Sequence, residues 1–330
     1  SEGVVPFGRI DAQGQRTLRW APWPGEEVAI AIQRPKGVEG QAMTIDRVDY
    51  EVRPGNRLLE AKLRLHARAS KGGIRRVTLP EGAQLQRVTI DGKERGLRAN
   101  GRVVQLPIET GKHRFEIRWQ QPWSRRLIED FPAVDIGGKA VNVTMTIARG
   151  EDRWLLWAIG PSWGPAVLFW SHVFVLLLLA IGLGRTPNSP LKTWQWLLLS
   201  LGFAQVPTPV LFIVVLWFFA MVWRKAYWAD RTTPDHAAWF DLSQLMLAGI
   251  TLGAMGALYA AIHSNLLLEV DMQVTGRNST NHQLNWYVDR VDGALPEAAI
   301  LSLPLLVWRV SMLAWSLWLV WSLLKWLPWA

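Results

Sequence analysis

Side chains that could carry catalysis are few in this sequence, and they do not fall into a recognisable catalytic pattern. The chain has no cysteine, so thiolate nucleophiles, disulfides and cysteine metal sites are excluded. Its histidines are scattered, and none has the spacing of a zinc ligand pair. Ser322 and Lys325 have the spacing of a serine–lysine pair but lack a partner motif. We therefore expect no catalytic residue, no metal, no cofactor and no enzymatic activity.

Arg309 attracts more interest, because it lies inside the last apolar run of the chain, Leu303 to Ala330. An ionisable residue within a membrane segment is costly and is by default a functional candidate. Arg309 precedes the boundary residue Lys325 by 16 residues, which is about 24 Å of helix. In a hydrocarbon core of about 30 Å, Arg309 then lies about 6 Å below the opposite surface, within reach of the headgroups. It is either an anchor at this boundary or the counter-charge of an anionic ligand.

A helical wheel of the same run provides Arg309 with polar neighbours. At about 100° per residue, Ser302 and Ser316 fall within roughly 20° of Arg309, and the tryptophans lie on other sides. The wheel predicts a polar stripe facing protein or water and tryptophans facing lipid. With other polar residues expected at this depth, the stripe defines a candidate outer-leaflet pocket: Arg309, Ser302, Ser316, His172, Tyr259, His263 and Gln205. The simpler interpretation is polar decoration of the interface around an arginine satisfied by protein groups.

The net charge of +9 comes wholly from the first half of the chain. Residues 1–150 contain 26 Lys and Arg against 17 Asp and Glu, whereas residues 151–330 contain 10 of each. Alternation in the first half puts four basic residues on one side of a strand, and they define a candidate basic face: Lys62, Arg64, His66 and Arg68. Such a face could bind an anionic polymer or lipid headgroups; the simpler interpretation is a solvated face. Nucleic acid is not expected as a partner, because no recognition helix or base-stacking motif is present.

The positions of these residues depend on two different kinds of element. Period-two alternation recurs through residues 15–148 with turn sequences between the runs, which predicts about eight or nine short strands. The expected fold is mixed: an all-β, antiparallel domain over residues 1–150, sandwich-like or an open barrel, followed by a helical transmembrane domain over residues 151–330. The helical domain is expected to have about five membrane segments, at 165–183, 194–205, 208–223, 242–262 and 298–324.

Three further features of residues 151–330 refine the expected fold. Pro207 and Pro209 interrupt the second and third segments, which are either two crossings or a re-entrant pair. The small residues Gly249, Gly253 and Gly256 predict close packing against another helix of the bundle or against another subunit. The loop at 263–297 alternates on both sides of GRNSTN, which predicts a β-hairpin that packs on or extends the first domain; a mobile polar loop is the alternative.

Basic residues flank the membrane segments on one side, so the positive-inside rule places the β domain in the periplasm and the C-terminus in the cytoplasm of a bacterial inner membrane. The expected function is a non-enzymatic adaptor or assembly subunit. Embedded in the lipid bilayer, it would bind an envelope partner, either a protein or an anionic glycan or lipid, and it could form a homo-oligomer. The alternative is a transport component for a lipid or small solute that uses the pocket around Arg309.

Overall fold

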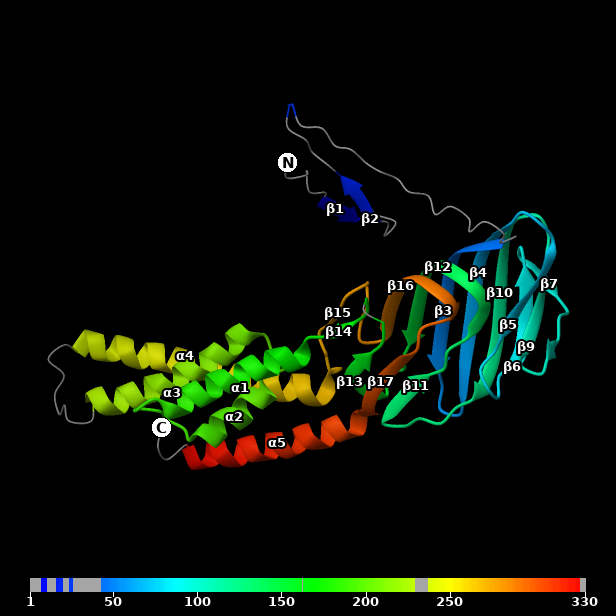
Figure 1. Ribbon diagram of the computed structural model, residues 1–330. Helices are drawn as coiled ribbons and strands as arrows, with labels where there is room; N and C mark the ends of the chain where they lie inside the picture. Colours follow the sequence, from blue (N-terminus) through cyan, green and yellow to red (C-terminus); the bar gives the residue numbers. More distant parts are fainter. Residues whose placement is uncertain are drawn as a thin grey trace. The chain divides into compact units, whose positions relative to one another are not determined.

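The computed structural model describes residues 7–10, 16–19, 24–25, 43–161, 163–228 and 237–326. The chain divides into two compact units, Ser1–Gln41 and Ala42–Ala330. In the first unit, β1 (Phe7–Ile10) pairs with β2 (Arg16–Arg19) in an antiparallel ladder. The second unit holds the other elements, most of which are labelled in Figure 1.

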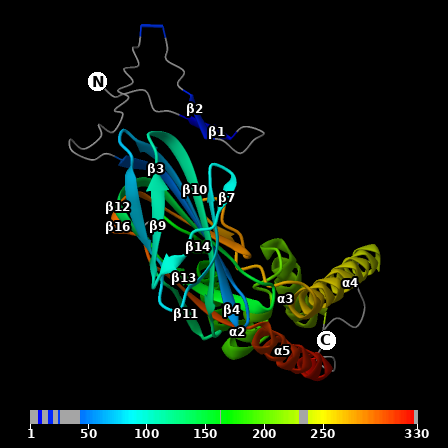
Figure 2. The same ribbon diagram turned by 90° about the vertical axis from the view of Figure 1, so that its right-hand side faces the viewer.

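The second unit has a β-rich domain whose main sheet curves as a half-barrel, and its strands can be followed in Figures 1 and 2. The ten strands of this sheet are β3 (Met43–Pro54), β4 (Leu58–Ala69), β5 (Gly73–Thr78), β6 (Gln84–Ile90), β7 (Lys93–Arg95), β8 (Ala99–Asn100), β9 (Val103–Ile108), β10 (Gly111–Pro122), β12 (Asp135–Ala148) and β16 (Gln283–Ala294). They follow the order β7-β6-β10-β4-β3-β12-β5-β9-β8, and β16 also pairs with β12.

The open barrel, one of the two forms predicted for this domain, is closer to the structure than the sandwich, and the prediction that all strands run antiparallel is wrong. One continuous curved sheet replaces two stacked sheets, and β3 and β12 run parallel to each other. The sheet bends where β12 changes register between Asp135 and Lys139. Gly137 lies at this bend with a φ of +71°, and a side chain there would collide with the carbonyl of Arg76. The curvature brings apolar side chains from distant strands into one core.

Alternation along the strands builds that core as the sequence pattern predicts. The inward residues of β4 are buried, from Leu59 through Leu65 to Ala69. Tyr50 of β3 and Trp119 of β10 lie on the same side, and their rings stack with centroids 5.9 Å apart. Each fully buried large apolar side chain contributes about 1.5–3 kcal/mol relative to exposure. The charged residues of these strands are thereby held on the opposite face.

Strands from the predicted loop at 263–297 join several sheets. β15 (Val274–Thr275) pairs with β14 (Ala166–Val167), whereas β16 pairs with β12 of the main sheet. The two halves of the predicted hairpin therefore pair with other strands rather than with each other. β17 (Ala298–Pro304) forms a three-stranded sheet with β11 (Ile128–Phe131) and β13 (Arg153–Ile159).

The described residues form five helices, of which three are long and apolar enough to cross a membrane. The helices are α1 (Phe169–Arg185), α2 (Thr193–Gly202), α3 (Thr208–Trp228), α4 (Ala237–Leu267) and α5 (Leu305–Trp326), and the three long ones are α3, α4 and α5. The prediction of five membrane segments is thus wrong. α1 has 17 residues and α2 has 10, which is short for a crossing. The predicted start of the last segment at 298 is also wrong, because residues 298–304 form β17.

Tryptophan side chains fasten α5 to α2 and α4. Trp315 packs its indole against Gly202 and donates from Nε1 to the Leu198 carbonyl at 2.8 Å. Trp308 donates to the carbonyl of Asn265 at 3.1 Å, and the Asn265 amide donates to the Gly202 carbonyl at 2.6 Å. Trp308 and Trp315 are buried, with 3% and 5% exposure. These two tryptophans therefore face protein and not lipid, contrary to the helical-wheel prediction.

Candidate functional site: the charged face of the sheet

The outer faces of β3, β4 and β10 carry the residues with the strongest case for binding. Register places charged residues side by side: Arg64 lies between Asp49 of β3 and Glu116 of β10, and Lys62 lies between Glu51 and Arg118. Opposite charges on neighbouring strands stabilise a sheet when they are directly opposed. We refer to this surface as the charged face; three of the four residues of the predicted basic face lie within its ion pairs: Lys62, Arg64 and Arg68.

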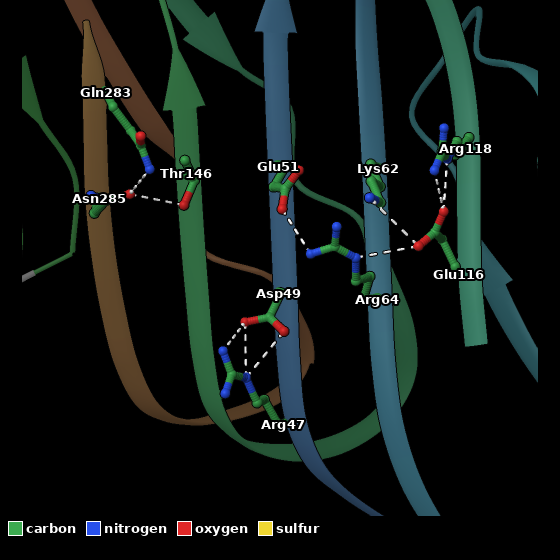
Figure 3. Close-up of polar contacts among 10 residues, drawn as sticks. All are labelled: Arg47, Asp49, Glu51, Lys62, Arg64, Glu116, Arg118, Thr146, Gln283 and Asn285. Carbon is green, nitrogen blue, oxygen red and sulfur yellow. Dashed lines mark hydrogen bonds and ion pairs between the residues drawn. The ribbon is translucent and has the colours of Figure 1, made fainter. Parts of the chain in front are cut away.

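A ladder of ion pairs crosses the middle of the charged face, as Figure 3 shows. Arg64 contacts Glu51 at 2.8 Å on one side and Glu116 at 3.3 Å on the other. Glu116 also contacts Lys62 at 3.5 Å and Arg118 at 2.6 Å. Partial burial by itself would raise the pKa of Glu116, but the hydrogen bonds and charges of Arg118, Lys62 and Arg64 hold this pKa below its usual range. Arg64 and Lys62 are thus engaged within the sheet.

On the side of the ladder near the helices, a groove of about 400 Å³ is open. Arg53 and Glu60 line this groove next to the turn between β3 and β4. Arg125 links the turn to the helical side, because it donates to the Gly55 carbonyl and pairs with Asp152. The Asp152 carbonyl in turn accepts from Leu305, the first residue of α5. We call this the proximal groove; its charged lining residues are Glu51, Glu60, Arg53, Lys62, Arg87 and Arg118.

At the far end of the ladder lies a second, more open groove of about 540 Å³, which we call the distal groove. Four cations and two histidines face two aspartates there: Arg47, Arg68, Lys112, Arg114, His66, His113, Asp46 and Asp91. Arg68 forms two hydrogen bonds with Asp46, at 2.6 and 2.7 Å. The Lys112 and Arg114 side chains have no ion-pair partner among the described residues. The groove therefore offers two uncompensated cations to a ligand.

The pKa values of the two histidines of the distal groove are shifted in opposite directions. Burial lowers the pKa of His66, and the neighbouring positive charge of Arg114 lowers it further. A hydrogen bond with Asp91 raises the pKa of His113, and the Nδ1–Oδ2 distance is 2.8 Å. The pKa of Asp91 is lowered by the backbone N–H of Arg114 and by His113. As the pH falls, His113 therefore gains a proton more readily than His66, and this proton adds positive charge to the groove.

Two of the four residues of the predicted basic face lie in the distal groove. His66 and Arg68 lie in the distal groove as neighbours, whereas Lys62 lines the proximal one and Arg64 lies between them. The prediction missed Lys112, His113 and Arg114, which β10 contributes. The alternation in HRFEIRW predicts that Arg114 points outward. The pairing of β10 with β4 cannot be predicted in this way, because the two strands are far apart in the sequence.

The candidate pocket residues around Arg309 make separate contacts. Arg309 is exposed one turn into α5, whereas Ser302 lies in β17 and accepts from Arg153 at 2.8 Å. The Ser316 hydroxyl bonds to the Met312 carbonyl in its own helix, and Gln205 exchanges hydrogen bonds with the backbone of Asp271. The remaining three are a partly exposed histidine in α1 and two neighbours in α4 with ring centroids 6.1 Å apart: His172, Tyr259 and His263.

A buried charge cluster near the start of α5 was not foreseen. Arg153 has a side chain 11% exposed and lies 3.9 Å from the buried carboxylate of Glu129. Burial raises the pKa of Glu129, opposed by the charge of Arg153, and burial lowers the pKa of Arg149 to about 10. Arg153 also donates to the Ser302 carbonyl at 2.6 Å. The cluster joins β13 to β17, so its geometry indicates a structural joint.

Other candidates from the sequence have local explanations. Lys325 places its ammonium 3.4 Å from the ring centroid of Trp321, and Ser322 is buried. Of the three glycines predicted to pack, Gly253 meets Ile213 of α3, whereas a side chain at Gly249 or Gly256 would meet open space. Among the described residues, no group of three or more His, Asp or Glu side chains could hold a metal ion. The expectations of no enzyme and no cofactor stay predictions.

Comparison with known proteins identifies no family for this chain. No protein-family model and no curated protein matches it. Among solved structures, an M1 zinc metallopeptidase from Deinococcus radiodurans aligns with a TM-score of 0.29 and 11% identity, over 36% of this chain and 34% of that one. A two-domain M1 zinc metallopeptidase bound to L-tryptophan aligns with a TM-score of 0.29 and 9% identity, over 37% of each chain. This chain thus spans about a third of those structures, and likeness at this level transfers no activity.

Proposed function

We propose that this membrane protein is a non-enzymatic adaptor of a bacterial inner membrane, whose β domain binds an anionic envelope partner on its charged face. The observation that carries this proposal is the distal groove, where Lys112 and Arg114 lack acidic partners among the described residues. Charged side chains held by a rigid sheet can bind an anion without first being ordered. The partner we infer is a glycan or protein segment that carries carboxylate, phosphate or sulfate groups.

The ion-pair ladder supports the choice of the distal groove over the rest of the charged face. Glu51 and Glu116 already compensate Arg64, so a partner there would have to displace existing pairs. Exposed ion pairs are individually weak, at about 0–1 kcal/mol. Lys112 and Arg114, which have no ion-pair partner among the described residues, require no such exchange, because the neighbouring acids Asp46 and Asp91 are already paired.

The distribution of basic residues at the helix ends supports a periplasmic β domain and a cytoplasmic C-terminus. Of the helices long enough to cross a membrane, α3 has Arg224 and Lys225 near its end, and α5 carries Lys325 in its last turn. α5 runs away from the β domain because Leu305 directly follows β17, and α3 begins three residues after Gln205, which bonds to the backbone of Asp271. Short cytoplasmic loops carry the excess of Lys and Arg in multi-pass proteins.

The binding proposal can be tested with two polymers that differ only in charge, dextran sulfate and neutral dextran. We expect the purified full chain to bind dextran sulfate, and the Lys112→Gln/Arg114→Gln variant to bind it roughly ten-fold more weakly, since each contact is an exposed charge pair. Microscale thermophoresis in detergent would measure the dissociation constants.

The matched control removes two exposed cations elsewhere on the sheet, in the variant Lys139→Gln/Arg290→Gln. This control should bind like the unaltered chain. Equal affinity for the two polymers, or equal loss in the control and the groove variant, would contradict a localised anion site.

A further inference from the structure

The small sheet of β11, β17 and β13 has one buried face and one exposed face. Phe131, on the buried face, stacks on Trp123 with ring centroids 5.3 Å apart. Glu129 and Ile300 share this face, because they lie directly opposite each other, and both are buried. This face is turned toward the core of the β domain, so the other face points away from that core.

The exposed face is apolar across all three strands. The register forms two rows on it, one of Ile128, Leu301 and Trp157 and the other of Asp130, Ala299 and Ile159. Ile128 is 56% exposed, and Trp157 and Ile159 are exposed as well. Asp130 is the one charged side chain of these two rows. Contiguous exposed apolar side chains of this kind mark a surface that contacts a protein or a membrane.

The first turns of two apolar helices show at which level this sheet lies. Trp170 of α1 donates from Nε1 to the Leu156 carbonyl of β13 at 2.8 Å. Trp308 of α5 packs on Trp154 of β13, with ring centroids 4.9 Å apart. β11, β13 and β17 accordingly lie at the end of the β domain from which the helices extend (Figure 1). The sheet is therefore level with the helix ends next to the β domain.

The length of α5 relates this level to the bilayer. Its 22 residues measure about 33 Å, which matches a hydrocarbon core of about 30 Å from end to end. The first turn of α5 is then at one surface of this core, and the sheet that contacts it is in the adjoining headgroup layer. Tryptophan side chains are enriched in this layer.

Continuity with the membrane span favours lipid over a protein partner. β17 passes directly into α5, whose exposed first-turn residues Leu306 and Val307 would contact acyl chains in a spanning helix. We propose that the exposed face of the small sheet lies in the headgroup layer of the leaflet next to the β domain, so that lipid covers Ile128, Trp157 and Ile159. The β domain then rests on the bilayer, whichever side of the membrane it occupies and whatever partner its charged face binds.

Single cysteines carrying a nitrobenzoxadiazole fluorophore test this proposal, because the chain has no cysteine of its own. The full chain is placed in phosphatidylcholine nanodiscs. The matched control for Ile128→Cys is Ile74→Cys, which replaces an isoleucine 68% exposed in β5, remote from the helices in Figure 1. We expect the label at position 128 to emit further to the blue than the label at position 74. A nitroxide on the lipid headgroup should quench the first label and spare the second.

Two results would overturn the proposal. Equal emission from the two labels would leave the face in water. A blue shift without quenching by the nitroxide would show that protein, such as a second copy of this chain, covers the face in place of lipid.

A second variant changes the face and reads the effect at a neighbouring position. Ile128→Glu/Ile159→Glu puts carboxylates into both rows, and charges resist transfer out of water. A label at Leu127→Cys, which is exposed beside the first row, should then lose its blue shift and its quenching. The control Ile74→Glu should leave that label unchanged, and an unchanged label in the double variant would contradict the assignment. Should the double variant unfold in a detergent melt, Ile159→Glu alone offers a smaller change with the same expected direction.

Discussion

At the residue scale, most basic side chains predicted for the charged face are already paired with carboxylates, so they add little net positive charge for a partner to bind. Alternation correctly indicates that Lys62, Arg64 and Arg68 share one face, yet each is held by a carboxylate from a neighbouring strand. The acids come from β3 and β10, which are placed by pairing and not by local sequence. The cations that remain available are on β10, outside the run that first suggested a basic face.

Glu116 is the residue whose removal should cost the most within this ladder, since it contacts three cations. We expect Glu116→Gln to lower the free energy of unfolding at pH 7 by about 1 kcal/mol, because the pairs are partly exposed. The pKa of Glu116 is lowered in the folded state. Its stabilisation is therefore present above the ordinary glutamate pKa of about 4.3 and is lost as the pH falls through the lower folded-state value.

Melting curves of the full chain in detergent, recorded by tryptophan fluorescence from pH 7 to pH 3, would measure this effect. The control Glu81→Gln removes an exposed carboxylate in the turn before β6. A difference between the Glu116 and Glu81 variants that persists unchanged at pH 3 would argue against the ladder as its cause.

At the element scale, periodicity predicts the kind of element better than its limits. The β-rich domain and the apolar helices are confirmed, because alternation and long apolar runs are local properties. The sequence pattern predicts a helix for the apolar stretch at 298–304, but this stretch pairs with β11 and β13 as the middle strand of a sheet. A short apolar run has no periodicity that separates a buried strand from a buried helix. The wheel drawn through Ser302 accordingly joined a strand residue to a helix.

The closest packing of an indole on a helix glycine is at Gly202, and not at Gly249, Gly253 or Gly256 as the sequence predicts. We expect Gly202→Ala to destabilise the chain by about 1–3 kcal/mol, since its methyl group would collide with the Trp315 indole. Gly249→Ala should instead be neutral or stabilise by about 0.5–1 kcal/mol, because its methyl group meets open space and alanine favours a helix.

Melting temperatures of both variants in the same detergent would compare the two positions directly. The pair of variants serves as its own control, since each change adds one methyl group to a helical glycine. A larger loss at Gly249 than at Gly202 would show that the Gly249 stripe is the site of closest helix approach after all.

At the scale of the whole molecule, apolar residues gather where the β domain meets the helices. Trp157, Ile159 and Trp163 are exposed there, on β13 and just after it, with 49%, 59% and 66% exposure. Tryptophan is enriched at membrane–water interfaces. Arg309 follows the start of α5 by four residues, about 6 Å along the axis, and is exposed. Its position at this level fits the anchor interpretation better than the pocket.

The absence of cysteine allows the orientation to be tested with single substitutions. We expect Lys71→Cys, on an exposed turn of the β domain, to react in intact spheroplasts with a maleimide that cannot cross the membrane. Lys325→Cys, exposed in the last turn of α5, should react only after the membrane is permeabilised. The reverse pattern of labelling would place the β domain in the cytoplasm and refute the proposed orientation.

The joint between β17 and α5 has a mechanical consequence. Pro304 ends the strand and Leu305 begins the helix, so no linker separates the sheet from the membrane span. Arg153 donates hydrogen bonds to the hydroxyl and the carbonyl of Ser302 in this strand, and the Leu305 amide donates to the Asp152 carbonyl. A load applied to the sheet by a bound polymer would therefore reach the bilayer as a tilt of α5 without first drawing out slack chain.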